Sequence, residues 1–326
     1  MFQEGTKEMN HSIPTTRNAN FQDRLRGTWV HHLYTGVRKA KRSLLRQSEG
    51  EAILLARYHR VHGKPLNINA PKTFTEKLFW RMISWNRGVH PIFTQLTDKY
   101  SVRTHVAETI GDQYLIKLLW SGETTQTIPF ERLPVSYVMK PSHSSQQVIV
   151  VKGQSERADD IDRASGWLDS NYYWIAREYQ YYHIKPRVMI EECLENPDGS
   201  LPLDYKIWCF NGVPELIQVI THTRDMSSFF DKTWTLLDLT NKEGRSQRSI
   251  TKPANLEEML AIASKLSVGF GFVRVDLYNI NGRVYFGELT FTPTSGHMKL
   301  QPDSWDARLG EKWDLSLEHR PPATRE

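Results

Sequence analysis

The sequence predicts an α+β protein with a mainly helical N-terminal region, and a change of periodicity along the chain supports this. Between about residues 21 and 110 apolar residues recur at helical spacing, for example at Val102, Val106 and Ile110. From residue 115 the spacing becomes the alternation typical of strands, with helical stretches between strand candidates. A helical region followed by a sheet-containing region is therefore expected.

The last helix of the N-terminal region has recognisable ends. Asp98 is suited to be its N-cap, because a carboxylate accepts hydrogen bonds from the free N–H groups of the first turn. Gly111 follows the last periodic residue, where a helix commonly stops.

Strand candidates then follow in two groups, each with one predicted helix. The helices are expected near 156–170 and at 255–266. The strands are expected at 115–120, 135–140, 147–152 and 187–194, and then at 205–210, 214–220, 271–278 and 283–291. Asn211-Gly212 and Asn281-Gly282 join two pairs of the second group, and Asn-Gly is a strong signal for a β-hairpin.

These patterns define the predicted domain organisation. The polar ends of the chain are expected to be disordered. The predicted segments are a disordered N-terminus at 1–20, a mainly helical region at 21–112, a first mixed lobe at 113–194, a second at 195–316 and a disordered tail at 317–326.

Composition excludes several classes of protein. The chain carries 42 basic and 37 acidic residues, largely interspersed, and no nucleic-acid-binding motif accompanies the net charge of +5. We therefore expect no nucleic-acid partner. Its two cysteines form no metal or disulfide framework, and neither a signal peptide nor an apolar stretch of membrane-spanning length is visible. A cytoplasmic protein is expected.

One segment departs from the even distribution of charge. Residues 24–46 are rich in arginine and lysine, with only scattered acids. Two roles fit this segment: a solvated helical face, or peripheral contact with the inner face of the membrane or with a lipid-linked substrate.

The last predicted hairpin carries the most informative polar residues. Arg274 and Asp276 share one face of their strand, and Glu288 and Thr290 share one face of theirs, because side chains alternate. A two-residue Asn-Gly loop would put the two carboxylates on opposite sides of the sheet. A three-residue loop at 280–282 with a G1 bulge would align all four side chains.

Two carboxylates and an arginine on one side of an otherwise apolar sheet need counter-charges. Magnesium together with nucleotide phosphates would supply them, and so would an Arg-Asp-Glu ion network without metal. Lys140 at a strand end and Lys206 within a strand are two further cations that fit an anionic ligand, although either could reach solvent instead.

The chain resembles the ATP-grasp family, specifically its teichuronopeptide-biosynthesis (TupA-like) branch. The resemblance extends over nearly all of residues 64–313. It rests on an ordered set of motifs, namely KTFTEKLFW, TDKYSVRTHVAETIG, YVMKPSH, IKPRVMIEECLE, DYKIWCFNG, KPANLEEMLAIASKLS and FVRVDLYNINGRVYFGELTFTPTSG.

The resemblance implies an ATP-grasp fold, with ATP held between the two mixed lobes. The first lobe would carry a phosphate lid and the second a magnesium site. Lys140 and Lys206 look like the lysines that hold the phosphates, and Asp276 and Glu288 look like Mg²⁺ ligands. Thr290 stands where many relatives have an asparagine ligand. The implied adenine hinge is Glu191, Glu192, Cys193 and Leu194, with Glu195 at the ribose.

The implied lid departs from the family. Relatives place glycines after the strand-ending lysine, because bare backbone N–H groups approach phosphates closely. Here residues 142–147 contain none, and His143, Ser144 and Ser145 are expected to supply the contacts instead.

The resemblance also implies the activity. A carboxylate would be phosphorylated by ATP to an acyl phosphate and then attacked by an amine, in the biosynthesis of a bacterial cell-surface polysaccharide or a peptide attached to it. The partners would be a carboxylate-bearing saccharide or peptide and an amine donor. The expected catalytic residues are Lys206, Arg274, Arg224 and His297, with His222 and Ser295 as further candidates for gripping the substrate.

Two other functions fit the same sequence. A kinase on this scaffold would transfer the phosphate to a sugar hydroxyl. A catalytically degenerate nucleotide- or glycan-binding module would explain the lid without glycines.

Overall fold

A computed structural model describes residues 29–88, 90–153, 157–221, 227–241 and 250–318 of the chain. The chain divides into a unit Met1–Glu49 and a unit Gly50–Glu326. The described part of the first unit is the beginning of α2 (Trp29–His62), a helix that continues into the second unit.

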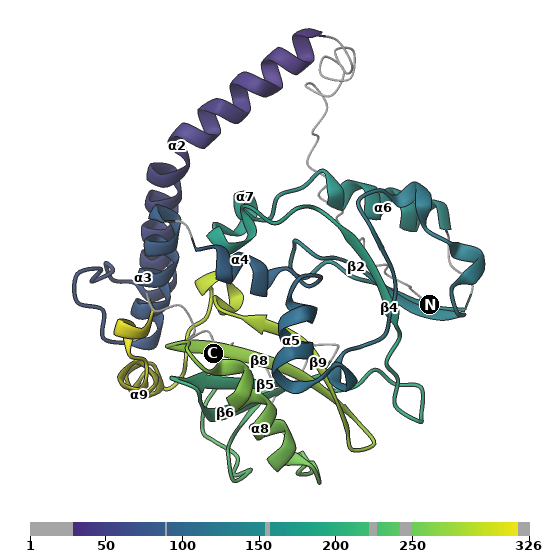
Figure 1. Ribbon diagram of the computed structural model, residues 1–326. Helices are drawn as coiled ribbons and strands as arrows, with labels where there is room; N and C mark the ends of the chain where they lie inside the picture. The colour runs from purple at the N-terminus through teal and green to yellow at the C-terminus, as the bar shows by residue number, and fades with distance from the viewer. Residues whose placement is uncertain (1–28, 89, 154–156, 222–226, 242–249, 319–326) are drawn as a thin grey trace, which may run out of the picture. The chain divides into compact units, whose positions relative to one another are not determined.

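The first sheet has four strands in the order β1-β4-β2-β3, paired antiparallel throughout. One helix, α6 (Arg157–Leu168), packs against β2 and β4, and buried aliphatic and aromatic side chains fill the space between them (Figure 1). The strands are β1 (Leu118–Gly122), β2 (Ser136–Pro141), β3 (Ile149–Lys152) and β4 (Val188–Glu192).

The second sheet has five antiparallel strands in the order β7-β6-β5-β8-β9. Its strands are β5 (Asp204–Phe210), β6 (Val213–Ile220), β7 (Ser227–Asp231), β8 (Phe272–Ile280) and β9 (Arg283–Thr290). All the predicted strands are present, and β7 is an additional one.

Helices cover the second sheet on both faces. On one face α8 (Leu256–Ser267) packs against β5, β6 and β8, and side chains of α4 (Pro91–Thr97) and α5 (Val102–Ile110) join the same core. On the other face α3 (Phe74–Arg87) and α9 (Ser304–Lys312) contribute to an aromatic core around Phe74 and Trp208.

The polar cluster continues this second face. Along β8 the residues Phe272, Arg274 and Asp276 point the same way. Phe272 packs beneath α3 and α9, whereas the two charged residues lie beyond the aromatic core. Part of the face is thus covered by helices, and the remainder is left to line a cavity.

The register of β8 and β9 differs from both predicted hairpins. The loop is the two-residue Asn281-Gly282 turn, with both residues at positive φ and Ile280 paired with Arg283. A bulge at Gly287 then shifts the register, so that Asp276 lies opposite Glu288 and Arg274 opposite Thr290. The expected alignment of the four side chains is confirmed, but the bulge produces it and not a three-residue turn.

Two predicted boundaries are wrong. Asp98 is the C-cap of α4 and not the N-cap of α5; its side chain accepts hydrogen bonds from Tyr100 N and Ser101 Oγ in the connecting turn. Glu318 was placed in a disordered tail, yet it is buried and ion-paired with Arg81. Neither the charge nor the proline content of the tail revealed that partner.

Candidate active site

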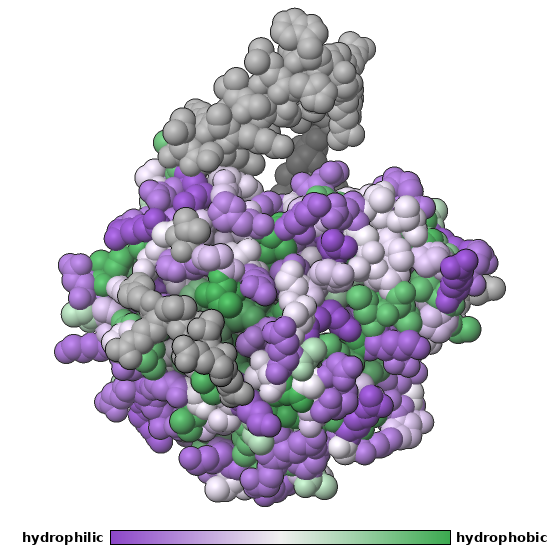
Figure 2. Space-filling view, in the orientation of Figure 1, coloured by the Kyte–Doolittle hydropathy of each residue, from purple (hydrophilic) through white to green (hydrophobic). Residues whose placement is uncertain are grey.

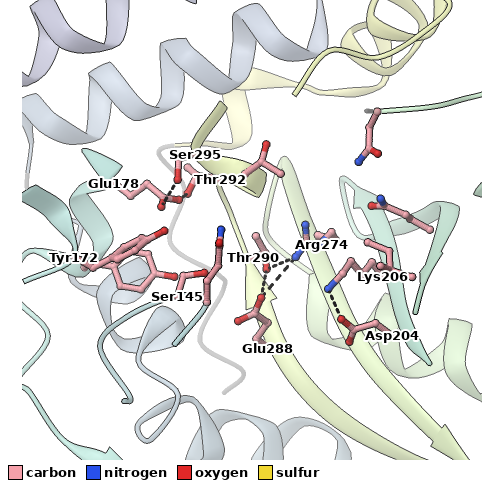
Figure 3. Close-up of a pocket in the computed structure, with 16 residues that line it drawn as sticks. Ser145, Tyr172, Glu178, Asp204, Lys206, Arg274, Glu288, Thr290, Thr292 and Ser295 are labelled. Carbon is pink, nitrogen blue, oxygen red and sulfur yellow. Dashed lines mark hydrogen bonds and ion pairs between the residues drawn. The ribbon is translucent and has the colours of Figure 1, made fainter. Parts of the chain in front are cut away.

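A polar cavity of about 160 Å³ opens on the charged face of the second sheet (Figure 3). Strands β5, β6, β8 and β9 form one wall, and the segment around α7 (Tyr173–Ala176) and η4 (Tyr179–Tyr181) contributes the other. On the surface seen in Figure 2, hydrophilic and apolar residues are interspersed. The cavity lining itself is mostly hydroxyl, amide and charged groups.

Lys206 and Arg274 form the cationic end of this cavity. The Arg274 guanidinium binds Asp276 through two hydrogen bonds of 2.7 Å, and Lys206 Nζ lies 2.7 Å from the same carboxylate. Lys206 also lies 3.0 Å from Asp204. Asp276 is almost fully buried and bonds both cations, so it fixes their positions at the cavity wall.

Glu288 is the carboxylate that faces this cavity from β9. Its side chain is 33% exposed, accepts a 3.0 Å hydrogen bond from the Thr290 hydroxyl and lies 3.6 Å from Arg274. Burial would raise the pKa of Glu288, but Lys99, Lys206 and Arg274 outweigh it and lower the pKa to about 2. Glu288 is therefore ionised at neutral pH.

Lys99 was missed by the sequence analysis. It lies between α4 and α5, and its Nζ is 3.6 Å from Glu288 and donates a 2.6 Å hydrogen bond to the Ser144 carbonyl. One ammonium group thus joins the segment after β2 to the carboxylate of β9. Nothing local marks it, because the sequence around it resembles an ordinary helix start.

The donor set fits magnesium. Mg²⁺ prefers hard oxygen ligands and commonly takes one or two carboxylates together with phosphate oxygens. Glu288 supplies an ionised carboxylate at the cavity, and Asp276 would join it by sharing oxygens that now bind Arg274 and Lys206. Within the described ranges no group of three or more His, Cys, Asp or Glu side chains that could hold a metal ion is found.

Lys140 lies in the first sheet, paired with a carboxylate of the neighbouring strand. Its Nζ is 2.6 Å from Glu191, and Arg103 lies 3.1 Å from the same side chain. Glu191 is thus directed inward as a counter-ion for two cations. The other predicted hinge residues are more exposed, and Glu195 lies 2.9 Å from Lys152. Any adenine contact of Glu191 would involve its backbone.

The glycine-free segment after β2 is partly built into the core. His143 accepts a hydrogen bond from Arg187 N at Nδ1 and bonds the Trp167 carbonyl through Nε2, so the ring is a neutral Nε2–H tautomer. Burial lowers its pKa, in agreement with the neutral form. Both ring nitrogens are used, so a phosphate contact would require breaking one of these bonds. Ser145 and Gln146 line the cavity, and Gln146 has φ 64°.

Glu178 forms the opposite end of the cavity and was not predicted. It follows α7 in a tyrosine-rich segment, and its carboxylate accepts hydrogen bonds from the Thr292 hydroxyl and, at 2.8 Å, from Ser295 Oγ. Burial raises the pKa of Glu178 to about 7, although the two hydroxyl groups oppose the shift. Ser295, a predicted substrate contact, therefore lines the cavity as a partner of this carboxylate.

His297 lies outside the cavity lining, and the other features named here fall wholly or partly outside the described residues. His297 is exposed, is not part of the cavity lining, and bonds the Thr294 carbonyl at 3.1 Å. Arg224 and His222 lie outside the described residues, as do residues 24–28 of the basic segment; residues 29–44 are described as helix backbone. In the described part of the chain no helix has the length and apolar character needed to cross a bilayer.

The cavity thus combines ion-paired cations with an ionised carboxylate. The family comparison is specific about the class: the TupA-like ATP-grasp family model matches residues 76–314. The chain belongs to this family and has the α+β ATP-grasp fold, with a helical N-terminal region. No curated protein matches the chain.

Solved ATP-grasp enzymes are similar at low identity. D-alanine–D-alanine ligase from Bacillus anthracis is 18% identical over 69% of this chain and 65% of that chain, with a TM-score of 0.41. The enzyme from Helicobacter pylori is 14% identical over 78% of this chain and 69% of that one, with a TM-score of 0.39. The ATP-grasp ligase PsnB, complexed with minimal precursor, Mg and ADP, is 9% identical over 68% and 59%, with a TM-score of 0.35. The chain thus spans less than two thirds of the length of the Bacillus anthracis enzyme.

Proposed function

We propose that this protein is an ATP-dependent ligase that joins a carboxylate to an amine through an acyl phosphate. The observation that carries the proposal is the pair Lys206 and Arg274, which Asp276 holds side by side at the cavity wall. Phosphoryl transfer depends mainly on positioning and on charge stabilisation of the transferring oxygens. Cations fixed before the ligand arrives provide that stabilisation without reorganising during the reaction.

For the other residues we propose the roles that the family resemblance implies. Lys140 would hold nucleotide phosphates, the backbone of residues 191–194 would receive adenine, and Glu195 would bind the ribose. Ser144 and Ser145 would cover the phosphates, with His143 fixing the shape of this segment. Mg²⁺, when bound by Glu288, Asp276 and Thr290, would neutralise phosphate oxygens. Thr290 now donates to Glu288, so its first task is to orient that ligand.

The substrates we propose are those of the family resemblance. A saccharide or peptide would supply the carboxylate, and a second molecule the amine, in the cytoplasmic biosynthesis of a cell-surface polymer. Arg224, His297 and the basic segment 24–46 are kept as proposed contacts for the larger substrate, the basic segment with a lipid-linked or membrane surface.

Product analysis tests the proposal. The full chain would be incubated with ATP, Mg²⁺, a uronic acid or acidic peptide and an amino acid, with ADP measured by a coupled assay and products by mass spectrometry. ADP together with an amide is the expected result. ADP with a phosphorylated sugar would identify a kinase, and nucleotide binding without turnover would identify a binding module.

A matched pair of lysine variants connects the assay to the site. Lys206→Met should lower ADP formation at least 100-fold, a typical effect of removing one stabilising charge. Lys312→Met removes a lysine that pairs with Glu215 away from the cavity, and it should leave turnover unchanged.

A further inference from the structure

Glu178 is a buried carboxylate that faces the cavity without a cationic partner. It is 4% exposed, and among the described residues no Lys, Arg or His nitrogen lies within ion-pair distance of it. Arg57 acts on it electrostatically, but the NH1 group of Arg57 donates to the carbonyls of Ala176 and Ser295, each at 2.8 Å. Only hydroxyl groups bond the carboxylate itself.

Three other buried carboxylates of the chain are ion-paired with basic side chains. Asp276 binds Arg274 and Lys206, Glu191 binds Lys140 and Arg103, and Glu318 binds Arg81. An ionised carboxylate taken out of water without a counter-charge costs several kcal/mol. Glu178 is therefore set up to receive a positive charge from something that enters the cavity.

We propose that Glu178 holds the ammonium group of the acceptor and removes one proton from it, so that the free amine attacks the acyl phosphate. This inference rests on the proposed ligase function and adds the subsite for its amine. The nitrogen forms a bond to the carbonyl carbon, and the bond from that carbon to the phosphate oxygen breaks, the phosphate leaving with the electron pair. Of the two protons that the ammonium loses, one goes to Glu178 and the other to the departing phosphate.

The arrangement of the cavity agrees with this role. Figure 3 shows Glu178 with Thr292 and Ser295 on one side, and Arg274, Lys206 and Glu288 across from them. Phosphoryl chemistry at the cationic side would thus take place opposite the carboxylate. A base whose pKa is near the working pH serves proton transfer best, and burial places the pKa of Glu178 at about 7.

The size of the cavity restricts the acceptor. A volume of about 160 Å³ is well above the roughly 10–15 Å³ that a single water molecule requires. This space admits a small primary amine such as an amino acid, together with the reacting carboxylate end of the other substrate. The nucleotide would lie on the side of Lys140, with its terminal phosphate at Lys206 and Arg274.

Direct titration of Glu178 tests the inference without any turnover. The full chain would be labelled with ¹³C at its glutamate side-chain carboxyls, and the Glu178 signal assigned with Glu178→Gln. The charged and titratable groups facing Glu178 are Arg57 from α2, Glu288 from β9, and Tyr172 and Tyr181 on either side of it. Ethylammonium chloride should lower the titration midpoint of Glu178, because a bound ammonium favours the ionised form.

Tetramethylammonium chloride is the control, since it carries the same charge but no N–H donor, and it should leave the midpoint in place. An unchanged midpoint with ethylammonium, or equal shifts with both salts, would overturn the ammonium subsite.

A kinetic ratio tests the proton transfer. Hydroxylamine is largely unprotonated at neutral pH, so it needs less help from a base than an amino acid does. Glu178→Gln should lower the ratio of amino-acid-dependent to hydroxylamine-dependent ADP formation about 100-fold. Equal losses with both nucleophiles would mean that Glu178 only supports the structure.

Ser295→Ala is a second variant that keeps the carboxyl group. It removes one of the two hydroxyl donors, so the acid limb of the amino-acid-dependent pH profile should move to higher pH; an unmoved limb would contradict the role. If the parent forms no ADP with any substrate pair, the ligase proposal fails, while the ethylammonium titration still decides whether Glu178 binds an amine.

Discussion

Each end of the cavity has a buried carboxylate, but the two carboxylates have different partners. At one end Asp276 is ion-paired with both Arg274 and Lys206. At the other end Glu178 is equally buried, but hydroxyl groups are its bonded partners among the described residues. The charge of Asp276 is neutralised by basic side chains before any ligand binds. Glu178 would gain a counter-charge from a ligand. The same substitution, carboxylate to amide, should therefore have different consequences at the two ends.

The largest effect is expected at the end of the cavity that contains Asp276. Asp276→Asn leaves two cations in the protein without their carboxylate, so it should lower the free energy of unfolding by about 3–5 kcal/mol and abolish Mg²⁺-dependent ATP turnover. Urea denaturation measures the first effect. Glu288→Gln is the comparison: turnover should be lost with a smaller loss of stability, because its side chain is one third exposed and solvent screens its interactions with the neighbouring cations. Equal stability losses in the two variants would contradict the account of Asp276 as the buried anchor.

At the other end of the cavity, Glu178 is expected to make the free energy of unfolding depend on pH. The folded-state pKa of Glu178 is raised from 4.5 to about 7, so the neutral form is favoured in the folded protein. The resulting stability is fully present below pH 4.5 and is lost as the pH rises through 7. This amounts to about 3 kcal/mol.

Urea denaturation at pH 5 and pH 8 checks this prediction. The parent protein should lose more stability between these pH values than Glu178→Gln does. Glu215→Gln, which changes a surface glutamate paired with Lys312, should behave like the parent. An identical pH dependence in all three proteins would show that Glu178 has an ordinary pKa.

The next largest effect is expected at the β9 bulge, which sets the register around Asp276. A Cβ atom at Gly287 would lie 3.0 Å from the Asp276 carbonyl oxygen, so Gly287→Ala should strain the register that places Asp276 opposite Glu288. We expect a loss of about 1–3 kcal/mol and a parallel loss of turnover. Gly166→Ala in α6 is the control, because its Cβ meets open space and should stabilise by about 0.5–1 kcal/mol. Unimpaired turnover in Gly287→Ala would mean that the bulge does not position the site.

The smallest effect is expected in the glycine-free segment. Gln146 has φ 64°, a conformation that glycine adopts at less cost, so Gln146→Gly should stabilise the protein by up to about 1 kcal/mol. Ser144 is not among the positive-φ residues, and Ser144→Gly should destabilise by about 0.5–1 kcal/mol. Thermal melting of both variants compares them; the same sign of change in both would contradict the conformational argument.

The positions of the strands and the polar face were predictable because they depend on local signals. Alternation located the strands, and the spacing of Arg274, Asp276, Glu288 and Thr290 placed each pair on one face. The bulge was not predictable: Asn281-Gly282 correctly indicates a two-residue turn, whereas the register shift depends on the close approach of Gly287 to the backbone of the neighbouring strand.

Glu178 and Lys99 could not be found from the sequence for a related reason. The hydroxyl partners of Glu178 lie 114 and 117 residues further along the chain, and Lys99 meets Ser144 and Glu288 only in the folded protein. The weak signal for Glu178 was a lone carboxylate within an aromatic segment. For Lys99 the adjacent Asp98 suggested a helix cap, which obscured its role.

Oxygen transfer tests the central claim most directly. The full chain would be incubated with ATP, Mg²⁺, an amino acid and a uronic acid or acidic peptide whose carboxylate carries ¹⁸O, and the released phosphate would be analysed by mass spectrometry. A ligase acting through an acyl phosphate transfers one carboxylate oxygen to phosphate, so we predict one ¹⁸O atom in the phosphate for each amide formed. ADP formation with no ¹⁸O in phosphate, and with the phosphoryl group on a sugar hydroxyl, would contradict the account.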